Sequence, residues 1–285
     1  MIISRIVGGL GNQLFQYATG LALARHHNVP FFLDIRGYAN DPLRTFSLGH
    51  FAISASVTAG DHLPTPEQIR SPLVRLMPWF HRPRGLRIYR EYSLAFDPSL
   101  TTHGNNIYLD GYWQSEKYFS AIATEVRQEF SLREPLDATN AERAKKMMAE
   151  ESISLHVRRG DYVNHPLYAT CSLAYYHAAL DRIRATHPTA TVYVFSDDPA
   201  WVKANITTDL PITYVTNNQG SADYKDLILM SACRHHVIAN SSFSWWGAWL
   251  GQAAGKIVIA PNAWYTDPTK DTRDLLPADW ITLPV

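Results

Sequence analysis

Cysteine is scarce in this chain, whose 285 residues include only Cys171 and Cys233. Two cysteines cannot form a disulfide framework, so a reducing cytosol is the compartment that fits best. Charge of neither sign is in excess, because 26 Lys and Arg balance 26 Asp and Glu. This balance argues against non-specific binding to nucleic acid, which normally requires a basic surplus.

Long uninterrupted apolar runs are also missing. The longest apolar stretch, residues 243–260, is broken by three glycines, a glutamine and a lysine, so it is unlike a transmembrane helix. No basic region followed by an apolar core precedes the first strand, and we therefore expect no signal peptide. Charged residues make up 18% of the chain and eight tryptophans are present, a composition that carbohydrate-binding proteins share with many others.

The first half of the chain opens with a βαβ pattern. Residues 2–7 and 29–34 are typical of strands, and apolar positions at helical spacing lie between them over 14–25, after a glycine turn. Residues 37–105 are rich in proline and show little pattern beyond a short helix at 74–80. A strand at 106–110 and a helix at 116–130 follow.

The second half is more regular. Five apolar runs alternate with helical segments, which predicts a parallel sheet with right-handed crossovers. The sequence therefore predicts an α/β protein of two Rossmann-like domains with parallel sheets, residues 1–137 and 138–285, whose tail at 271–285 packs back on the first domain. The five predicted strands are 152–157, 191–195, 211–215, 236–239 and 256–260.

Charge gathers at the end of the strand at 152–157, where the sequence continues His156-Val-Arg158-Arg159-Gly-Asp161. Two guanidinium groups at the end of a buried strand need anionic partners or water, and open α/β sheets bind ligands outside the carboxyl ends of their strands. Arginine suits phosphate because its planar fork holds two oxygens. We interpret the stretch as part of a site for an anionic ligand. The alternative is a structural ion pair, with Asp161 as the partner of Arg159.

The glycine turn at residues 8–11 is a second candidate. Gly9 and Gly11 let the backbone approach a ligand closely, and Asn12 would present its amide at the start of the helix. A dinucleotide fingerprint with Asp34 on a ribose is a further interpretation, but Leu14 stands where that pattern needs its third glycine. A tight turn capped by Asn12 explains the same residues equally well.

A third candidate is the strand-to-helix turn at Asn240-Ser241-Ser242-Phe243. Helix N-termini present unpaired N–H groups and a positive dipole end, which bind phosphate, and the serine hydroxyls add two donors. N-capping by serine would use the same atoms. The tryptophan pair at 245–246 is more typical of a core than of a ligand-stacking surface.

Metal-binding patterns are weak in this sequence. It has no Asp-x-Asp motif, and Asp197 and Asp198, just before Pro199, are better explained as a helix cap. The adjacent histidines at 26–27 and 235–236 point apart on a helix or a strand, so they make poor ligand pairs. We therefore expect no metal site.

Four blocks of the sequence resemble the signature blocks of the α-1,2-fucosyltransferases, glycosyltransferase family 11. The resemblance runs from residue 2 to about residue 262 and leaves roughly 40–100 without a motif. It implies a GT-B fold whose two domains face each other across a cleft, GDP-fucose as the donor, inversion at the anomeric carbon, and no metal or other cofactor. The blocks are Gly8–Tyr17, His156–Tyr162, Val194–Asp198 and Asp226–Leu250.

The resemblance also implies roles for single residues. Arg158 matches the arginine that holds the β-phosphate, and His156 and Asp226 match the pair that recognises guanosine. Asn12 would contact the fucose. The other residues expected at the donor are Gly9, Gly11, Asp197, Asn240, Ser241, Ser242 and Phe243.

The sequence leaves the general base open. Asp161 and His165 follow the arginines directly and are the nearest candidates, which makes Arg158, Asp161, His165 and Asn12 the expected catalytic set. A strongly dissociative reaction would need little help from a base, because the acceptor proton could pass to the departing phosphate.

The acceptor that the resemblance implies is a galactose-terminated oligosaccharide, such as lactose or a bacterial surface glycan, fucosylated at O2. A bacterial cytosolic enzyme working on lipid-linked glycan at the inner face of the membrane fits this expectation. Three other functions compete with it: a GT-B transferase of another nucleotide sugar, an NAD-dependent oxidoreductase, and a non-catalytic sugar-binding module.

Overall fold

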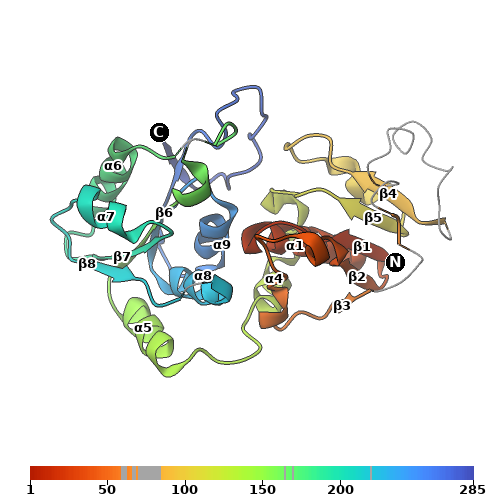
Figure 1. Cartoon of the computed structure of the whole chain (residues 1–285), viewed down its shortest axis with the longest axis horizontal. Helices are drawn as coiled ribbons and strands as arrows, with labels where there is room; N and C mark the ends of the chain where they lie inside the picture. The colour runs from red at the N-terminus through yellow and green to blue at the C-terminus, as the bar shows by residue number, and fades with distance from the viewer. Residues whose placement is uncertain (59–62, 66–68, 70–84, 164, 169, 219) are drawn as a thin grey trace. The chain divides into compact units, whose positions relative to one another are not determined.

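The computed structural model describes residues 1–58, 63–65, 69, 85–163, 165–168, 170–218 and 220–285. The short helix expected at 74–80 lies outside the described residues. The chain forms two compact units, each built around its own sheet (Figure 1). Within the described ranges, no helix combines the length and the apolar character that a membrane crossing requires. The units are residues 1–133 with 273–275, and residues 134–272 with 276–285.

The first unit contains a five-stranded sheet in the order β3-β2-β1-β5-β4, in which each neighbouring pair is parallel. Strand β1 is central, and its fully buried Ile2 lies opposite Phe31 on one side and Ile107 on the other. The described strands and helices are β1 (Ile2–Arg5), α1 (Leu10–His27), β2 (Phe31–Asp34), β3 (Ser56–Val57), β4 (Arg87–Arg90), β5 (Ile107–Asp110) and α4 (Ala123–Glu129).

Helix α1 begins at Leu10, one turn earlier than the apolar pattern predicts. Its buried Gln16 accepts the N–H of Val7 at 2.9 Å and donates to the carbonyl of Gly111 at 3.1 Å. A polar side chain inside this helix therefore ties the segment after β1 and the residue after β5 to the helix. An argument from apolar periodicity cannot predict the burial of such a polar residue.

The helix expected over 116–130 is wrong in its first half. Two short 3-10 turns, Glu116–Tyr118 and Ser120–Ile122, precede α4. Phe119, which separates them, is fully buried, so packing of this ring overrides the local helical preference.

The second unit contains a six-stranded sheet in the order β11-β10-β9-β6-β7-β8, again with parallel neighbours. Its helices and strands are α5 (Ala138–Ala149), β6 (Ser152–Val157), α6 (Leu173–Arg184), β7 (Thr191–Ser196), α7 (Pro199–Asn205), β8 (Ile212–Val215), α8 (Asp223–Ala232), β9 (His235–Val237), α9 (Ser242–Leu250), β10 (Val258–Pro261) and β11 (Ile281–Leu283).

Alternate residues of β7 divide the core of this unit into two layers. Val192 and Val194 pack with α6 and α7, whereas Tyr193 and Phe195 pack with α5 and α8. Strand β6 alternates in the same way. Its Val157 joins the α6 layer, so His156 projects to the opposite face.

These findings confirm the predicted α/β fold of two Rossmann-like units with parallel sheets. The units divide between Arg133 and Glu134, where a division after 137 was expected. The tail is shared between them, because residues 273–275 group with the first unit whereas β11 extends the second sheet beside β10.

Candidate functional site

The carboxyl end of the central strand β6 delivers Arg158 into a pair of carboxylates. Its Nη1 lies 3.0 Å from Oδ2 of Asp197, and its Nη2 lies 2.5 Å from Oδ1 of Asp161. Asp197 also accepts the backbone N–H of Arg159 at 2.9 Å. The predicted pairing of Asp161 with Arg159 is therefore corrected, because the structure pairs Asp161 with Arg158.

Arg159 is held by the start of α7. Its Nε lies 3.2 Å from Asp198, and its guanidinium carbon stands 3.9 Å from the centre of the Trp201 ring. Asp198 also accepts the N–H of Trp201 and so caps α7, which confirms the helix-cap interpretation for this residue. Asp197 has a different task, since it orients the arginine loop.

His156 lies behind these charges and is buried, with 5% of its surface exposed. Burial, reinforced by the positive charge of Arg158, lowers the pKa of His156 to about 3, so the imidazole is neutral at physiological pH. Its Nδ1 has no hydrogen-bond partner among the described residues. The ring centre of Phe243 lies 5.8 Å away. A buried polar atom of this kind calls for a ligand or a water.

Phe243 belongs to the first turn of α9. Ser241 occupies the N-cap position, yet no side chain among the described residues caps the helix. Serine capping, the alternative interpretation of this turn, is thus wrong, and the first-turn N–H groups remain suited to an anion. Trp245 and Trp246 are fully buried and belong to the core, as expected.

Asn240 contributes to the site indirectly. Its Nδ2 donates to the carbonyl of Trp264 at 3.1 Å, and its backbone carbonyl accepts the hydroxyl of Tyr162 at 3.3 Å. The guanidinium of Arg158 lies 5.4 Å from the centre of the same Tyr162 ring. Tyr162 therefore connects the arginine loop to the turn that precedes α9.

Asp226 lies in the first turn of α8, where its Oδ1 accepts Nδ2 of Asn218 at 2.7 Å. Burial, together with the nearby charge of Asp223, raises the pKa of Asp226 to about 7. A carboxyl group with this pKa exchanges its proton near neutrality, which is a feature of functional sites.

The glycine turn of the first unit has a different construction from the expected one. Gly9 is the N-cap of α1, Gly11 is buried inside the helix, and Gly8 has φ +80°. Asn12 accepts Nε2 of Gln114 at 2.8 Å rather than capping the helix, so the interpretation of Asn12 as a cap is wrong.

Asp34 is occupied by structural contacts. It accepts two bonds from the Arg36 side chain, at 2.9 and 2.8 Å, and the hydroxyl of Tyr108 at 2.7 Å. The carboxylate is buried among these donors. This removes the residue on which the dinucleotide interpretation depends.

His165 is poorly arranged for a general base. Its Nδ1 accepts the backbone N–H of Leu167 at 3.1 Å. In the neutral ring the proton must then be on Nε2, and that nitrogen cannot accept the proton of an attacking hydroxyl.

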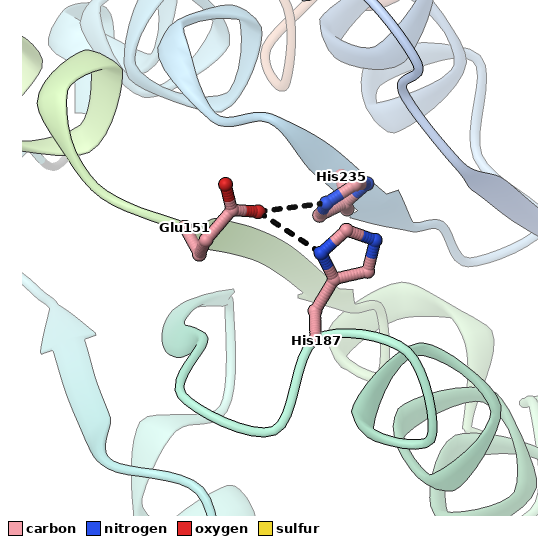
Figure 2. A group of neighbouring side chains, drawn as sticks. All are labelled: Glu151, His187 and His235. Carbon is pink, nitrogen blue, oxygen red and sulfur yellow. Dashed lines mark hydrogen bonds and ion pairs between the residues drawn. The ribbon is translucent and has the colours of Figure 1, made fainter.

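One polar cluster escaped the sequence analysis because its members are distant in the chain. Figure 2 shows the Glu151 carboxylate facing the neighbouring rings of His187 and His235, and its Oε2 lies 3.1 Å from the first and 3.3 Å from the second. It lies at the amino ends of β6, β7 and β9, away from the arginine loop. His235 accepts the Ile257 N–H at Nδ1, so its proton is on Nε2 and points at Glu151. This arrangement satisfies the group without an ion.

The second unit therefore gathers most of the expected residues at the carboxyl edge of its sheet. His156, Arg158 and Asp161 follow β6, and Asp197 follows β7. Asp226 and the turn at residues 241–243 begin α8 and α9. Sequence reasoning missed Tyr162 and Asn218, since neither has a recognisable chemical pattern.

Known proteins resemble the chain over its whole length. A family model described as glycosyl transferase family 11 matches residues 88–284. An Escherichia coli alpha-1,2-colitosyltransferase is 31% identical over 99% of both chains. The O-antigen biosynthesis glycosyltransferase WbnK of the same organism is 30% identical over 98% of this chain and 99% of its own. Mouse galactoside 2-alpha-L-fucosyltransferase Sec1 is 27% identical over all of this chain and 72% of its own.

Solved structures agree on the fold. Fucosyltransferase NodZ from Bradyrhizobium has a TM-score of 0.53 at 14% identity, covering 86% of this chain and 91% of its own. A mutant of Arabidopsis thaliana FUT1 in complex with GDP has a TM-score of 0.55 at 12% identity, covering 94% and 72%. The expected GT-B class is thereby confirmed.

Proposed function

The chain belongs to glycosyl transferase family 11, and from this premise we propose that it transfers L-fucose from GDP-β-L-fucose to O2 of a terminal β-galactoside, with inversion and without a metal. The observation that carries the proposal is Arg158, held at the carboxyl end of β6 by Asp197 in the same unit as the uncapped start of α9. The family's fucosyltransferases supply the chemical class of donor and product.

The reaction that this geometry supports begins with the acceptor hydroxyl. Its oxygen attacks the anomeric carbon while the bond from that carbon to the β-phosphate oxygen breaks, and the electron pair leaves with GDP. Arg158 and the first-turn N–H groups of α9 would stabilise the charge that develops on the phosphate. The hydroxyl proton passes to Asp161 or to the departing phosphate.

Recognition of the base falls to His156 and Asp226. The ionised carboxylate of Asp226 can accept the N1–H and the 2-amino group of guanine together, and the neutral His156 has an unoccupied Nδ1 among the described residues. Gly9, Gly11 and Asn12 of the first unit are proposed to contact the sugar. Asn240 is a support of the phosphate turn in this proposal, because its side chain bonds Trp264.

A second candidate activity is the transfer of colitose. The Escherichia coli relative named for that sugar is 31% identical over almost the whole chain. Relatives of this kind and WbnK, named for O-antigen biosynthesis, also support a bacterial cytosolic enzyme that works on lipid-linked glycan at the inner face of the membrane.

The deciding experiment measures GDP release from GDP-fucose with and without lactose, in buffer that contains EDTA. Lactose-dependent release, with a product linked at O2, is the expected result. The same assay with the colitose donor compares the two sugars through kcat/KM. Absence of release from either donor, together with absence of GDP binding, would refute the nucleotide assignment.

A further inference from the structure

Three polar side chains, Asn218, Asn140 and Asp137, form a continuous hydrogen-bonded network behind Asp226. Asn218 donates through Nδ2 to Asp226 at 2.7 Å and to Oδ1 of Asn140 at 3.0 Å. Asn140 donates in return through Nδ2 to Oδ1 of Asn218 at 2.9 Å and to Oδ2 of Asp137 at 2.8 Å. Asn140 and Asn218 are both buried, with 1% and 9% of their surfaces exposed.

Asp137, the side chain of this network farthest from Asp226, determines which groups donate and which accept. Asp137 is a carboxylate and can only accept, and it also takes the backbone N–H of Asn140 at 3.0 Å. Asn140 must therefore turn its NH₂ group toward Asp137 and toward Asn218. This in turn obliges Asn218 to accept at Oδ1 and to present its NH₂ group to Asp226.

Asn218 has no spare bonding capacity for another orientation. Its Oδ1 receives Asn140 and Asn217, and both hydrogens of its Nδ2 are used. Rotating the amide by half a turn would set its single oxygen against both the Asp226 carboxylate and the Asn140 carbonyl oxygen. The buried pair of Asn140 and Asn218 thus fixes the orientation of the Asp226 carboxylate through the bond to its Oδ1.

We propose that Asn218 is a positioning residue that makes the enzyme selective for guanine, by orienting the Asp226 carboxylate toward the adjacent N1–H and 2-amino donors of that base. The inference rests on the proposed GDP-linked donor. A donated hydrogen bond also favours the ionised carboxylate, which is the form that accepts both guanine hydrogens. The other charged groups around Asp226 are Asp223 and Arg143, with Lys225 and Asp137 paired to each other beside it.

The test compares binding of GDP and of IDP, which lacks the 2-amino group, to wild type and to Asn218→Ala. Removing a donor to a charged acceptor is expected to weaken GDP binding about tenfold, with a smaller effect on IDP. The GDP preference should shrink, and the pH midpoint of GDP binding should rise. The phosphates titrate alike in both nucleotides, so their contribution cancels in the comparison.

Two further variants separate positioning from folding. Asn218→Asp keeps the size of the side chain but faces Asp226 with a second carboxylate, so it should weaken GDP binding more than the alanine variant does. Asn262→Ala is the matched control, because Asn262 is exposed and its backbone bonds Leu283, outside the side chains that hold Asp226. It should retain the wild-type preference for GDP over IDP.

The outcomes distinguish the inference from the function beneath it. If wild type prefers GDP to IDP and the two Asn218 variants keep that preference and pH midpoint, the positioning role is wrong and the donor assignment stands. An equal loss of GDP and IDP binding, with a lowered Tm and an unmoved midpoint, would show that Asn218 only supports the fold. If wild type binds neither nucleotide, both proposals fail.

Discussion

Asp197 forms an ion pair with the Arg158 side chain, with 3.0 Å between Oδ2 and Nη1, directly across the sheet edge from it. The register explains this placement, because Val157 of β6 pairs with Ser196 of β7 and the next residues along each strand are Arg158 and Asp197. The second oxygen of Asp197 takes the N–H of Arg159. The arginine loop is thus oriented by its neighbouring strand before any ligand arrives.

This preorganisation makes Arg158 the residue whose loss should affect turnover most. Arg158→Ala is expected to lower kcat by about 100- to 1,000-fold, the usual effect of removing one oriented donor from a developing anion. Arg158→Lys should recover part of the rate, because an ammonium supplies charge without the planar fork. Arg184→Ala is the matched control, because Arg184 lies at the end of α6 and pairs with Asp209. This variant should have the wild-type kcat.

The glycine between the arginines and Asp161 provides a steric test of the same loop. A Cβ on Gly160 would lie 2.7 Å from Oδ2 and 3.3 Å from Cγ of Asp197. Gly160→Ala should displace that carboxylate from Arg158. Overpacking costs about 1–3 kcal/mol, so we expect GDP binding to weaken by about tenfold or more. Gly49→Ala has its nearest contact at 3.9 Å and should bind GDP as wild type does. Equal affinities for the two variants would contradict the role given to Asp197.

Asp161 combines two roles that one substitution can separate. The side chain of Asp161 is 47% exposed, whereas that of Asp197, the other partner of Arg158, is 26% exposed. Asp161 is therefore the partner that a phosphate would displace. Asp161→Asn should therefore tighten GDP binding by about two- to fivefold, the scale of an exposed ion pair. If Asp161 is also the base, kcat falls steeply in the same variant. Near-normal kcat would assign the proton to the departing phosphate.

The sequence predicted the parts of this site that depend on strand ends and charge. Arg158 follows an apolar strand, and strand order then brings it to Asp197 without further information. The sequence could not predict which arginine pairs with Asp161, because both arginines are within reach and the choice depends on the geometry of the loop. Asn218 shows the limit most clearly: its importance comes from a buried pairing with Asn140, 78 positions away.

The Glu151 cluster of Figure 2 leads to a prediction about metals. His235 uses Nδ1 for the Ile257 N–H and Nε2 for Glu151, and Glu151 also lies 3.3 Å from Arg234. A zinc ligand would need a free lone pair that His235 does not have in this tautomer. Dialysis against EDTA should leave both Tm and GDP release unchanged. A fall in Tm that zinc restores would show that the cluster holds a metal.

The pKa of Asp226 predicts that donor binding depends on pH near neutrality. Burial raises this pKa to about 7, and guanine requires the ionised form, so binding of GDP-fucose should release protons. Raising the pH from 6 to 8 should tighten binding about tenfold, because the ionised fraction grows from about a tenth to nine-tenths. His156 adds no dependence, since its pKa of about 3 keeps it neutral throughout.

The raised pKa of Asp226 has the opposite effect on folding, because it makes the fold less stable at the pH values that favour donor binding. The unfolded chain loses the Asp226 proton near pH 4 and the folded one near pH 7, so this carboxyl makes the fold less stable as pH rises through that interval. Asp226→Asn removes both effects, which makes it the control for titration of any other group. Calorimetry of GDP-fucose binding in buffers of different ionisation enthalpy counts the released protons. Proton release that persists in Asp226→Asn would assign the titration to another residue, and the loss of release would tie guanine recognition to this carboxylate.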